Sequence, residues 1–313
     1  MMSYYPIPSG GYLRIGGEDR VTFLQRQTTN DLGLVQPGRA GLTVLTTPTA
    51  RILDVLYVLP EAEALGVITL PGRGDSTRRY LQGRVFFMDK VTVADASVEL
   101  AQIDLWGPEA PIILERLGID PQLQPDRVAA GVFEGTSVQA LVLEPTFGLG
   151  ARLLLPAVGL AAIQAFFAQS GAAQLSDEEY SVMRVEAGLP AAGAELTEDY
   201  TPLETGLAAA ISSTKGCYTG QEVVARQLTY DKVTQHLCGL RLEDHAQPGE
   251  RLWAADGSPA GKITSAVASP RFGEIALAVV KRPHHQPGET LRVGETLETA
   301  VRGQVVALPF HAA

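Results

Sequence analysis

The sequence predicts an α+β protein made of two ferredoxin-like α/β units and a small C-terminal β-barrel. Three observations carry this prediction. The first region has strand and helix patterns in the order β-α-β-β-β-α-β, a second region repeats that theme less clearly, and the last places short strands between regularly spaced turns. With 313 residues, the chain is long enough for two or three domains. We predict domains at residues 1–98, 99–236 and 237–313.

The first region begins with a strand at residues 13–15. The acidic pair Glu18-Asp19 then introduces an amphipathic run, as is typical of a helix start. A helix at residues 76–86 and a strand at 91–93 complete the region. Between the two helices lie three strand-like runs, at residues 40–46, 52–59 and 65–70. This order resembles a split ferredoxin-like unit with one extra strand, and not a series of βαβ units.

The second region contains a predicted strand at residues 100–105 and predicted helices at 110–117 and 160–169. Between the helices, two apolar runs at 139–143 and 151–155 flank the glycine-rich stretch 147–150. These runs predict two paired strands joined by a turn.

A capping box follows, with Ser176 at the N-cap and Glu179 three residues later, and it opens a helix that runs towards Glu186. The next segment, residues 187–215, is rich in Gly, Pro and Ala. Irregular segments of this length are usually functional or disordered.

The third region changes character from about Leu237. Turn signals separate its short strands at a regular spacing, which predicts a small all-β barrel. The turns lie at residues 247–250, 256–259, 269–273 and 286–289.

Charge and cysteine content exclude several classes. The net charge is −10 and the pI is about 5.0, which argues against broad binding to nucleic acid or anionic membranes. Two interpretations stay open for five basic residues: a local basic patch, or the solvated face of a helix. The residues are Arg73, Arg78, Arg79, Arg84 and Lys90. Cys217 and Cys238 are too few for a disulfide framework or a zinc site, and the five histidines lack zinc-ligand spacing, so no metal site is expected. The sequence has no signal-peptide pattern and no membrane-spanning run, so we expect a cytoplasmic protein.

The most informative motif is Lys215-Gly216-Cys217-Tyr218-Thr219-Gly220-Gln221-Glu222. A nearby lysine and the start of a helix both favour a thiolate, so Cys217 is a candidate reactive thiol. The alternative is a small buried cysteine in a glycine-rich loop that caps the helix. From the residues alone, both interpretations stay open.

Two carboxylates are further candidates. Glu186, in the pair Arg184-x-Glu186 at a helix end, can accept two parallel hydrogen bonds from a planar amidine-like edge; the alternative is a salt bridge with a nearby arginine. Asp54 lies in an aliphatic strand-like run, either as an acid or base in a cavity or on the solvent face of the strand. Residues 28–31, which include Asn30, are expected to form a turn that closes the first helix.

Together these motifs resemble the YgfZ folate-binding proteins, whose mitochondrial relatives are iron–sulfur assembly factors. The cysteine motif is the most specific part of the resemblance. Three other stretches are similar to the family's N-terminal, central and C-terminal patterns: residues 17–31, residues 184–196 with Arg184-Val185-Glu186-Ala187-Gly188-Leu189-Pro190, and residues 261–278. The wider superfamily includes the glycine-cleavage T-protein, a tetrahydrofolate-dependent aminomethyltransferase.

The resemblance implies three domains in a ring around a central folate channel. It implies that Glu186 grips the pterin of tetrahydrofolate or a folate derivative, and that Cys217 is the functional thiol with Lys215 beside it. T-proteins carry an Asp-Asp pair where this chain has Asp54-Val55, which weakens the case for aminomethyl transfer. Further cofactor-binding candidates are Arg184, Asn30, Tyr218 and Gln221.

The function that this resemblance implies is that of a folate-binding accessory protein for iron–sulfur cluster assembly or repair, supporting enzymes such as those of tRNA methylthiolation. Its expected partners are iron–sulfur client enzymes or assembly proteins. Whether it turns over a substrate is left open. One alternative is an aminomethyltransferase of T-protein type in which Asp54 is the essential carboxylate. The other is a non-catalytic, folate-gated binding module.

Overall fold

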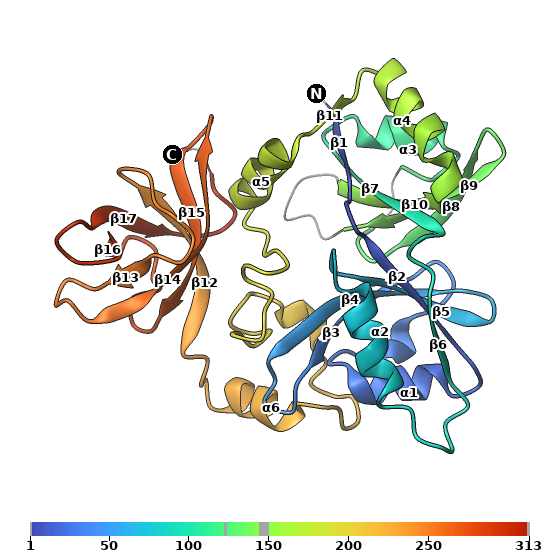
Figure 1. The fold of residues 1–313 in the computed structure, drawn as a ribbon, viewed down its shortest axis with the longest axis horizontal. Coiled ribbons are helices and arrows are strands. Elements are labelled where there is room, and N and C mark those ends of the chain that lie inside the picture. The colour runs from blue at the N-terminus through green and yellow to red at the C-terminus, as the bar shows by residue number, and fades with distance from the viewer. Residues whose placement is uncertain (1, 122–123, 144–149, 312–313) are drawn as a thin grey trace. The chain divides into compact units, whose positions relative to one another are not determined.

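The computed structural model describes residues 2–121, 124–143 and 150–311, and its contacts divide the chain into two compact units (Figure 1). Unit 1 comprises the chain up to Pro48, Leu53–Ser176 and Ala209–Thr219. Unit 2 comprises Thr49–Ile52, Asp177–Ala208 and the chain from Gly220 onwards. The three predicted domain boundaries, the ring and the channel stay predictions.

The first sheet of unit 1 has five strands in the order β3-β4-β5-β2-β6. The strands are β2 (Gly11–Gly16), β3 (Gly41–Thr46), β4 (Ile52–Pro60), β5 (Ala64–Thr69) and β6 (Thr92–Asp95). Helices α1 (Arg20–Gln27) and α2 (Gly74–Gln82) pack on it through Phe23, Leu24 and Leu81, and the short 3-10 helix η1 spans Leu32–Leu34. The predicted order of strands and helices is confirmed.

Helix α2 ends at Gln82, so the prediction of a helix to residue 86 was wrong at its C-terminal end. Gly83 follows directly, and glycine is a poor helix former. Beyond it, the Asp89 carboxylate accepts a hydrogen bond from the Phe86 backbone N–H at 2.8 Å, which fixes a turn instead of another helical turn.

The second sheet of unit 1 has six strands in the order β11-β1-β7-β10-β9-β8. These are β1 (Ser3–Pro6), β7 (Leu100–Trp106), β8 (Val128–Phe133), β9 (Thr136–Val142), β10 (Gly150–Pro156) and β11 (Ala173–Gln174). The predicted pairing of β9 with β10 is confirmed, with Leu153 opposite Ala140. Of the turn predicted at 147–150, residues 147–149 lie outside the described residues. Strands β1, β8 and β11 were not predicted.

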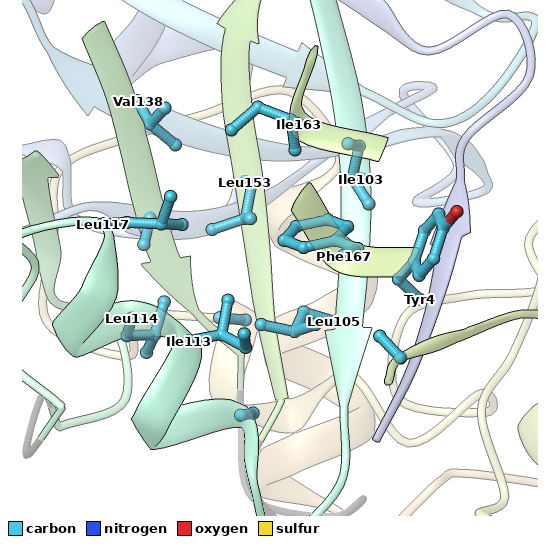
Figure 2. Packing of buried hydrophobic residues seen from close by; sticks show 14 of the residues in the cluster. Tyr4, Ile103, Leu105, Ile113, Leu114, Leu117, Val138, Leu153, Ile163 and Phe167 are labelled. Carbon is cyan, nitrogen blue, oxygen red and sulfur yellow. The ribbon is translucent and has the colours of Figure 1, made fainter. Parts of the chain in front are cut away.

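Helices α3 (Ala110–Arg116) and α4 (Leu160–Gln169) supply one side of the core of this sheet; the 3-10 helix η2 spans Ala157–Gly159. Figure 2 shows Ile163 and Phe167 of α4 and Leu114 of α3 meeting strand residues such as Leu153. The Phe167 ring also lies 4.9 Å from that of Tyr4 on β1. This contact adds to the backbone pairing of β1 with β7 and β11, which holds the N-terminal strand in the second sheet.

Unit 2 contains a closed six-stranded barrel with the strand order β12-β15-β14-β13-β16-β17, as predicted. Its strands are β12 (Gln235–Leu242), β13 (Arg251–Trp253), β14 (Pro259–Ser269), β15 (Gly273–Lys281), β16 (Thr290–Gly294) and β17 (Val301–Val306). Helix α5 (Asp177–Glu186) packs on the barrel by burying Val185 against Ile275 and Leu277. The 3-10 helix η3 (Ala208–Ala210) belongs largely to unit 1, whereas α6 (Gln221–Thr229) belongs to unit 2.

None of the helices among the described residues combines the length and apolar character needed to cross a membrane.

Candidate functional site

Lys215 is buried in unit 1, with 8% of its surface exposed. Its Nζ donates to the backbone oxygens of Gln25 (2.6 Å), Thr28 (2.6 Å) and Asn30 (2.7 Å). These oxygens lie at the C-terminal end of α1 and just beyond it, where helices leave carbonyls unpaired and carry a partial negative charge. An ammonium has three N–H donors, so all three are used on this helix end.

This contact makes Lys215 a clamp between the cysteine motif and α1. Burial lowers the pKa of Lys215 to about 8, against the opposing effect of the Asp31 carboxylate. The ammonium form, which alone has three donors, therefore predominates at neutral pH. The Nζ also lies 5.1 Å from the Tyr218 ring centroid. The predicted action of Lys215 on the thiol stays a prediction.

Cys217 is exposed, although the residues around it are fixed. Lys215 anchors the chain before it. After it, Tyr218 is 8% exposed, the Thr219 N–H donates to Arg26 O at 3.3 Å, and Thr219 O accepts from the Thr46 hydroxyl at 2.7 Å. The alternative of a buried structural cysteine is therefore wrong for Cys217.

Cys238 provides the contrast. It lies buried on β12, and burial raises the pKa of its thiol to about 11. A thiol in that state is a poor nucleophile and a poor metal ligand at neutral pH. The exposed thiol of Cys217 is accordingly the candidate for chemistry.

Asn30 lies in the turn held by Lys215, as predicted, but its amide is engaged in the fold. Its Nδ2 donates to Leu42 O (2.8 Å) and Ala209 O (3.2 Å), and its Oδ1 accepts from the Asp31 N–H. Burial raises the pKa of Tyr218 to about 12, so its phenol stays protonated. The cofactor-binding roles of Asn30 and Tyr218 stay predictions.

Asp54 is fully buried in unit 1, so the alternative of a solvent-facing strand position is wrong. Its Oδ1 accepts from the N–H groups of Val55 (2.9 Å) and Leu70 (3.0 Å), and its Oδ2 accepts from the Thr77 hydroxyl. Burial raises the pKa of Asp54 to about 7, although the three hydrogen bonds act in the opposite direction. The catalytic role of Asp54 stays a prediction.

In unit 2, Arg184 is held within a buried polar cluster. Its guanidinium donates to Leu189 O (2.7 Å) and the Ser265 hydroxyl (2.9 Å), and lies 3.4 Å from the Glu195 carboxylate. Glu195 is fully buried and also accepts from Ser265 (2.7 Å) and the Ala191 N–H (2.9 Å). These contacts join α5, the following segment and β14.

Glu186 has a more open environment at the end of α5. Its Oε1 accepts from the Ser269 hydroxyl at 2.6 Å, and its Oε2 accepts from Arg271 at 3.1 Å. The Glu186 side chain is 12% exposed, whereas that of Arg271 is 70% exposed. The predicted salt-bridge alternative is thus present, but the arginine partner is a largely solvated one.

Three buried residues of these clusters were not among the predicted site residues: Glu195, Ser265 and Ser269. The exposed Arg271, which pairs with Glu186, was not predicted either. The signals for Glu195, Ser265 and Ser269 lay in the sequence, because Gly193-x-Glu195 and the stretch 261–270 belong to the quoted patterns.

Gln221, which was predicted, begins α6 directly after Gly220, whose positive φ of +88° suits glycine. The structure thus places Cys217, Lys215, Asp54, Asn30 and Tyr218 in unit 1, and Glu186, Arg184 and Gln221 in unit 2.

Within the part of the chain that the structure describes, no group of three or more His, Cys, Asp or Glu side chains is arranged to hold a metal ion.

Comparisons with known proteins agree with this architecture. The glycine cleavage T-protein C-terminal barrel domain matches residues 235–311, and the GCVT N-terminal domain matches residues 8–143. The chain is 31% identical over 305 residues to a putative chloroplastic transferase of Arabidopsis thaliana, covering 96% of this chain and 69% of that protein. It is 30% identical over 318 residues to the aminomethyltransferase of Geobacillus kaustophilus, covering 96% and 85% respectively. The chain belongs to the glycine cleavage T-protein family.

A solved T-protein confirms the fold. The glycine cleavage system aminomethyltransferase T from Bartonella henselae superposes with a TM-score of 0.86 at 21% identity, covering 99% of this chain and 86% of that one.

Glu186 fits the folate that the T-protein family implies. A carboxylate has about four acceptor positions, and among the described residues each Glu186 oxygen accepts one side-chain hydrogen bond. Both oxygens therefore retain capacity for a pair of N–H donors, such as those of a pterin edge. Arg184 does not contact this carboxylate in the described hydrogen bonds, because its donors point to Leu189, Ser265 and Glu195.

Proposed function

We propose that this member of the T-protein family is a folate-binding accessory protein for iron–sulfur cluster assembly or repair, and that Cys217 carries its chemistry. The observation that supports this most is the exposed Cys217 in a loop whose neighbours are fixed on both sides. The client enzymes include those of tRNA methylthiolation, as the resemblance to the YgfZ family implies.

The geometry suits a thiol that acts on a large substrate. A thiolate is both a nucleophile and a soft metal ligand, and access decides whether it can be used. Because Lys215 and Thr219 hold the backbone, Cys217 can meet a cluster iron, a sulfane sulfur or a one-carbon unit without prior rearrangement of its loop.

Folate binding is assigned to Glu186. When bound, a tetrahydrofolate supplies a carrier for one-carbon units. The role of this chain is to hold the pterin edge on the Glu186 carboxylate, whose position is fixed by the Ser269 hydroxyl. Ser269 is itself held by the N–H groups of Arg271 (3.0 Å) and Phe272 (2.9 Å), so the acceptor is pre-positioned.

The decisive experiment replaces Cys217 with serine in cells that depend on this protein and measures methylthiolated tRNA. We expect at least a tenfold loss relative to the matched variant Ser213→Ala, an exposed position in the same loop. Full retention of methylthiolation by Cys217→Ser would rule out the thiol function.

Folate binding has its own test, calorimetric titration with tetrahydrofolate. Glu186→Gln is expected to weaken binding by about 1–3 kcal/mol, the scale of hydrogen bonds to a charged group. Glu178→Gln, at an exposed position on the same helix, serves as the control and should bind as the wild type does. Equal affinities for wild type and Glu186→Gln would remove Glu186 from the folate site.

A second candidate function is aminomethyl transfer of T-protein type. It is favoured by relatives named aminomethyltransferase, which align over most of this chain. Assays with an aminomethylated lipoyl carrier and tetrahydrofolate separate the two functions. Turnover that depends on Asp54 and survives Cys217→Ser would support this second function over the first.

A further inference from the structure

The segment between α2 and β6 exposes three consecutive large apolar side chains. Phe86 is 63% exposed, Phe87 98% and Met88 70%. We call residues 83–90 the apolar loop. Single exposed hydrophobic residues are normal on protein surfaces, but contiguous ones mark interaction sites.

The apolar loop is held in place by polar contacts. The Asp89 carboxylate accepts from the Phe86 N–H at 2.8 Å and forms an ion pair with Arg26 of α1. The Arg26 guanidinium in turn lies 5.3 Å from the Phe23 ring centroid and 5.5 Å from that of Phe86. Docking through a loop that is already ordered costs less conformational entropy than docking through a flexible one.

The same end of α1 also holds the cysteine motif. Arg26 O accepts the Thr219 N–H at 3.3 Å, and Gln25 O accepts from Lys215 Nζ at 2.6 Å. The apolar loop and the exposed Cys217 are therefore fastened to consecutive residues of one helix within unit 1. A partner that docks on the loop would therefore engage the same helix end that anchors the Cys217 loop.

Local charge indicates what kind of partner fits. Residues 73–90 contain five basic and two acidic residues, a net charge of +3, in a chain whose net charge is −10. Arg84 stacks on Tyr80 at 4.8 Å, and Lys90 pairs with Glu18 at a solvated position, where ion pairs are weak. A segment of net positive charge that ends in an apolar loop attracts and orients an acidic surface.

We propose that the apolar loop docks an acidic partner protein, which receives Phe87 in an apolar pocket and presents its reacting group to Cys217. The inference rests on the proposed role of Cys217 and adds the surface by which its partner is recognised. A protein suits this position better than a lipid surface, because the loop shares its anchoring helix with a thiol whose proposed clients are iron–sulfur proteins.

The experiment places a photo-crosslinking amino acid at Met88 in the full-length chain and irradiates the cells that produce it. We expect an adduct with one discrete acidic protein, identified by mass spectrometry. With that protein purified, Phe87→Ser should raise the Kd by at least about tenfold, as expected for loss of an aromatic anchor. Saturating partner should also slow alkylation of Cys217 by iodoacetamide.

Val98→Ser is the matched control, since Val98 is 90% exposed and lies in unit 1 outside the apolar loop. It should leave the Kd unchanged. Because the Phe87 side chain is almost fully exposed, Phe87→Ser should fold normally, and thermal unfolding checks this. An adduct with lipid, with a second copy of this chain or with no molecule would overturn the proposal, as would a Kd that Phe87→Ser does not change.

Tetrahydrofolate binding separates this inference from the proposed function. Phe87→Ser is expected to bind tetrahydrofolate as the wild type does. Absence of folate binding by the wild type would contradict the proposed function while leaving the docking result intact, and loss of docking with normal folate binding would contradict only the inference.

Discussion

The polar groups at Lys215 and Asp54 in unit 1 and at Glu186 in unit 2 differ in how much of their hydrogen-bonding capacity the fold itself uses. In unit 1, all three N–H donors of Lys215 form hydrogen bonds with backbone carbonyls, and the fully buried Asp54 accepts three hydrogen bonds. In unit 2, Glu186 remains partly exposed, and its ionic partner Arg271 is largely solvated.

This difference separates residues that build the site from residues that are free to act. A buried polar group whose partners lie in its own fold stabilises that fold, and recruiting it for chemistry would leave those partners unpaired. Cys217 in unit 1 and Glu186 in unit 2 do not carry that cost. This difference supports the proposal that Cys217 carries the chemistry and Glu186 the folate binding.

The largest loss of unfolding free energy is expected from Arg184→Met, which removes one partner of the buried ion pair in unit 2. The variant leaves the fully buried Glu195 without its ionic partner, and breaking a buried pair costs about 3–5 kcal/mol of unfolding free energy. Chemical denaturation measures this cost.

Arg271→Met is the matched control, because it removes the solvated partner of Glu186 on the same barrel. Its cost should stay below about 1 kcal/mol. Adding Glu195→Gln to Arg184→Met should recover part of the lost stability, since the uncompensated charge is then removed as well. Similar costs for Arg184→Met and Arg271→Met would contradict the distinction between the buried Arg184–Glu195 cluster and the partly exposed Glu186–Arg271 pair.

Asp54→Asn is expected to change the free energy of unfolding in a pH-dependent way. The folded pKa of Asp54, about 7, lies above its unfolded value of 3.8, so the stability that it contributes is fully present below pH 3.8 and is lost as the pH rises through 7. Three pKa units correspond to at most about 4 kcal/mol. Asparagine does not titrate, so Asp54→Asn should gain stability relative to wild type between pH 4 and pH 8.

The hydrogen bonds of Asp54 make asparagine a fair replacement. Both backbone donors converge on Oδ1, which an amide oxygen reproduces, and the amide N–H₂ can donate to the Thr77 hydroxyl. Thr77→Val, which removes a donor to the carboxylate, should move the titration of Asp54 to higher pH. Parallel stability curves for wild type and Asp54→Asn would show that this carboxylate is not titrating in a buried site.

The sequence predicted the parts of this arrangement that depend on local pattern. Strand-like apolar runs located eight of the eleven strands of unit 1, the turn spacing located the barrel, and the cysteine motif predicted that a helix begins at Gln221. The end of α2 was misjudged because the contact that stops it comes from Asp89, beyond the helical pattern.

Other parts that were missed depend on contacts between distant residues. Strand β1 pairs with β7, about a hundred residues later, and the partners of Lys215 lie 185 to 190 residues away. Neither the hydrophobic period nor a short motif encodes such pairings, because each depends on how whole elements pack. The exposure of Cys217 and the enclosure of Asp54 follow from those packed contacts.

The smallest of these losses of unfolding free energy is expected from Lys215→Met. This variant is also the most direct test of the contacts in unit 1. Methionine fills the path of the lysine stem but leaves three carbonyls without their donor, at a cost of about 2–3 kcal/mol. Hydrogen exchange of residues 212–219 should accelerate, because Lys215 is the anchor on the N-terminal side of Cys217. Lys232→Met, which alters an exposed lysine, is the control and should change neither quantity.

Lys215→Arg separates the position of the donors from the charge, because arginine keeps a cation but cannot place three donors as an ammonium does. If Lys215 acts by holding the loop on α1, hydrogen exchange should be faster in this variant too. If Lys215→Met leaves exchange unchanged while slowing alkylation of Cys217, the lysine acts on the thiol and not on the loop, and the contrast between the two units no longer holds at this residue.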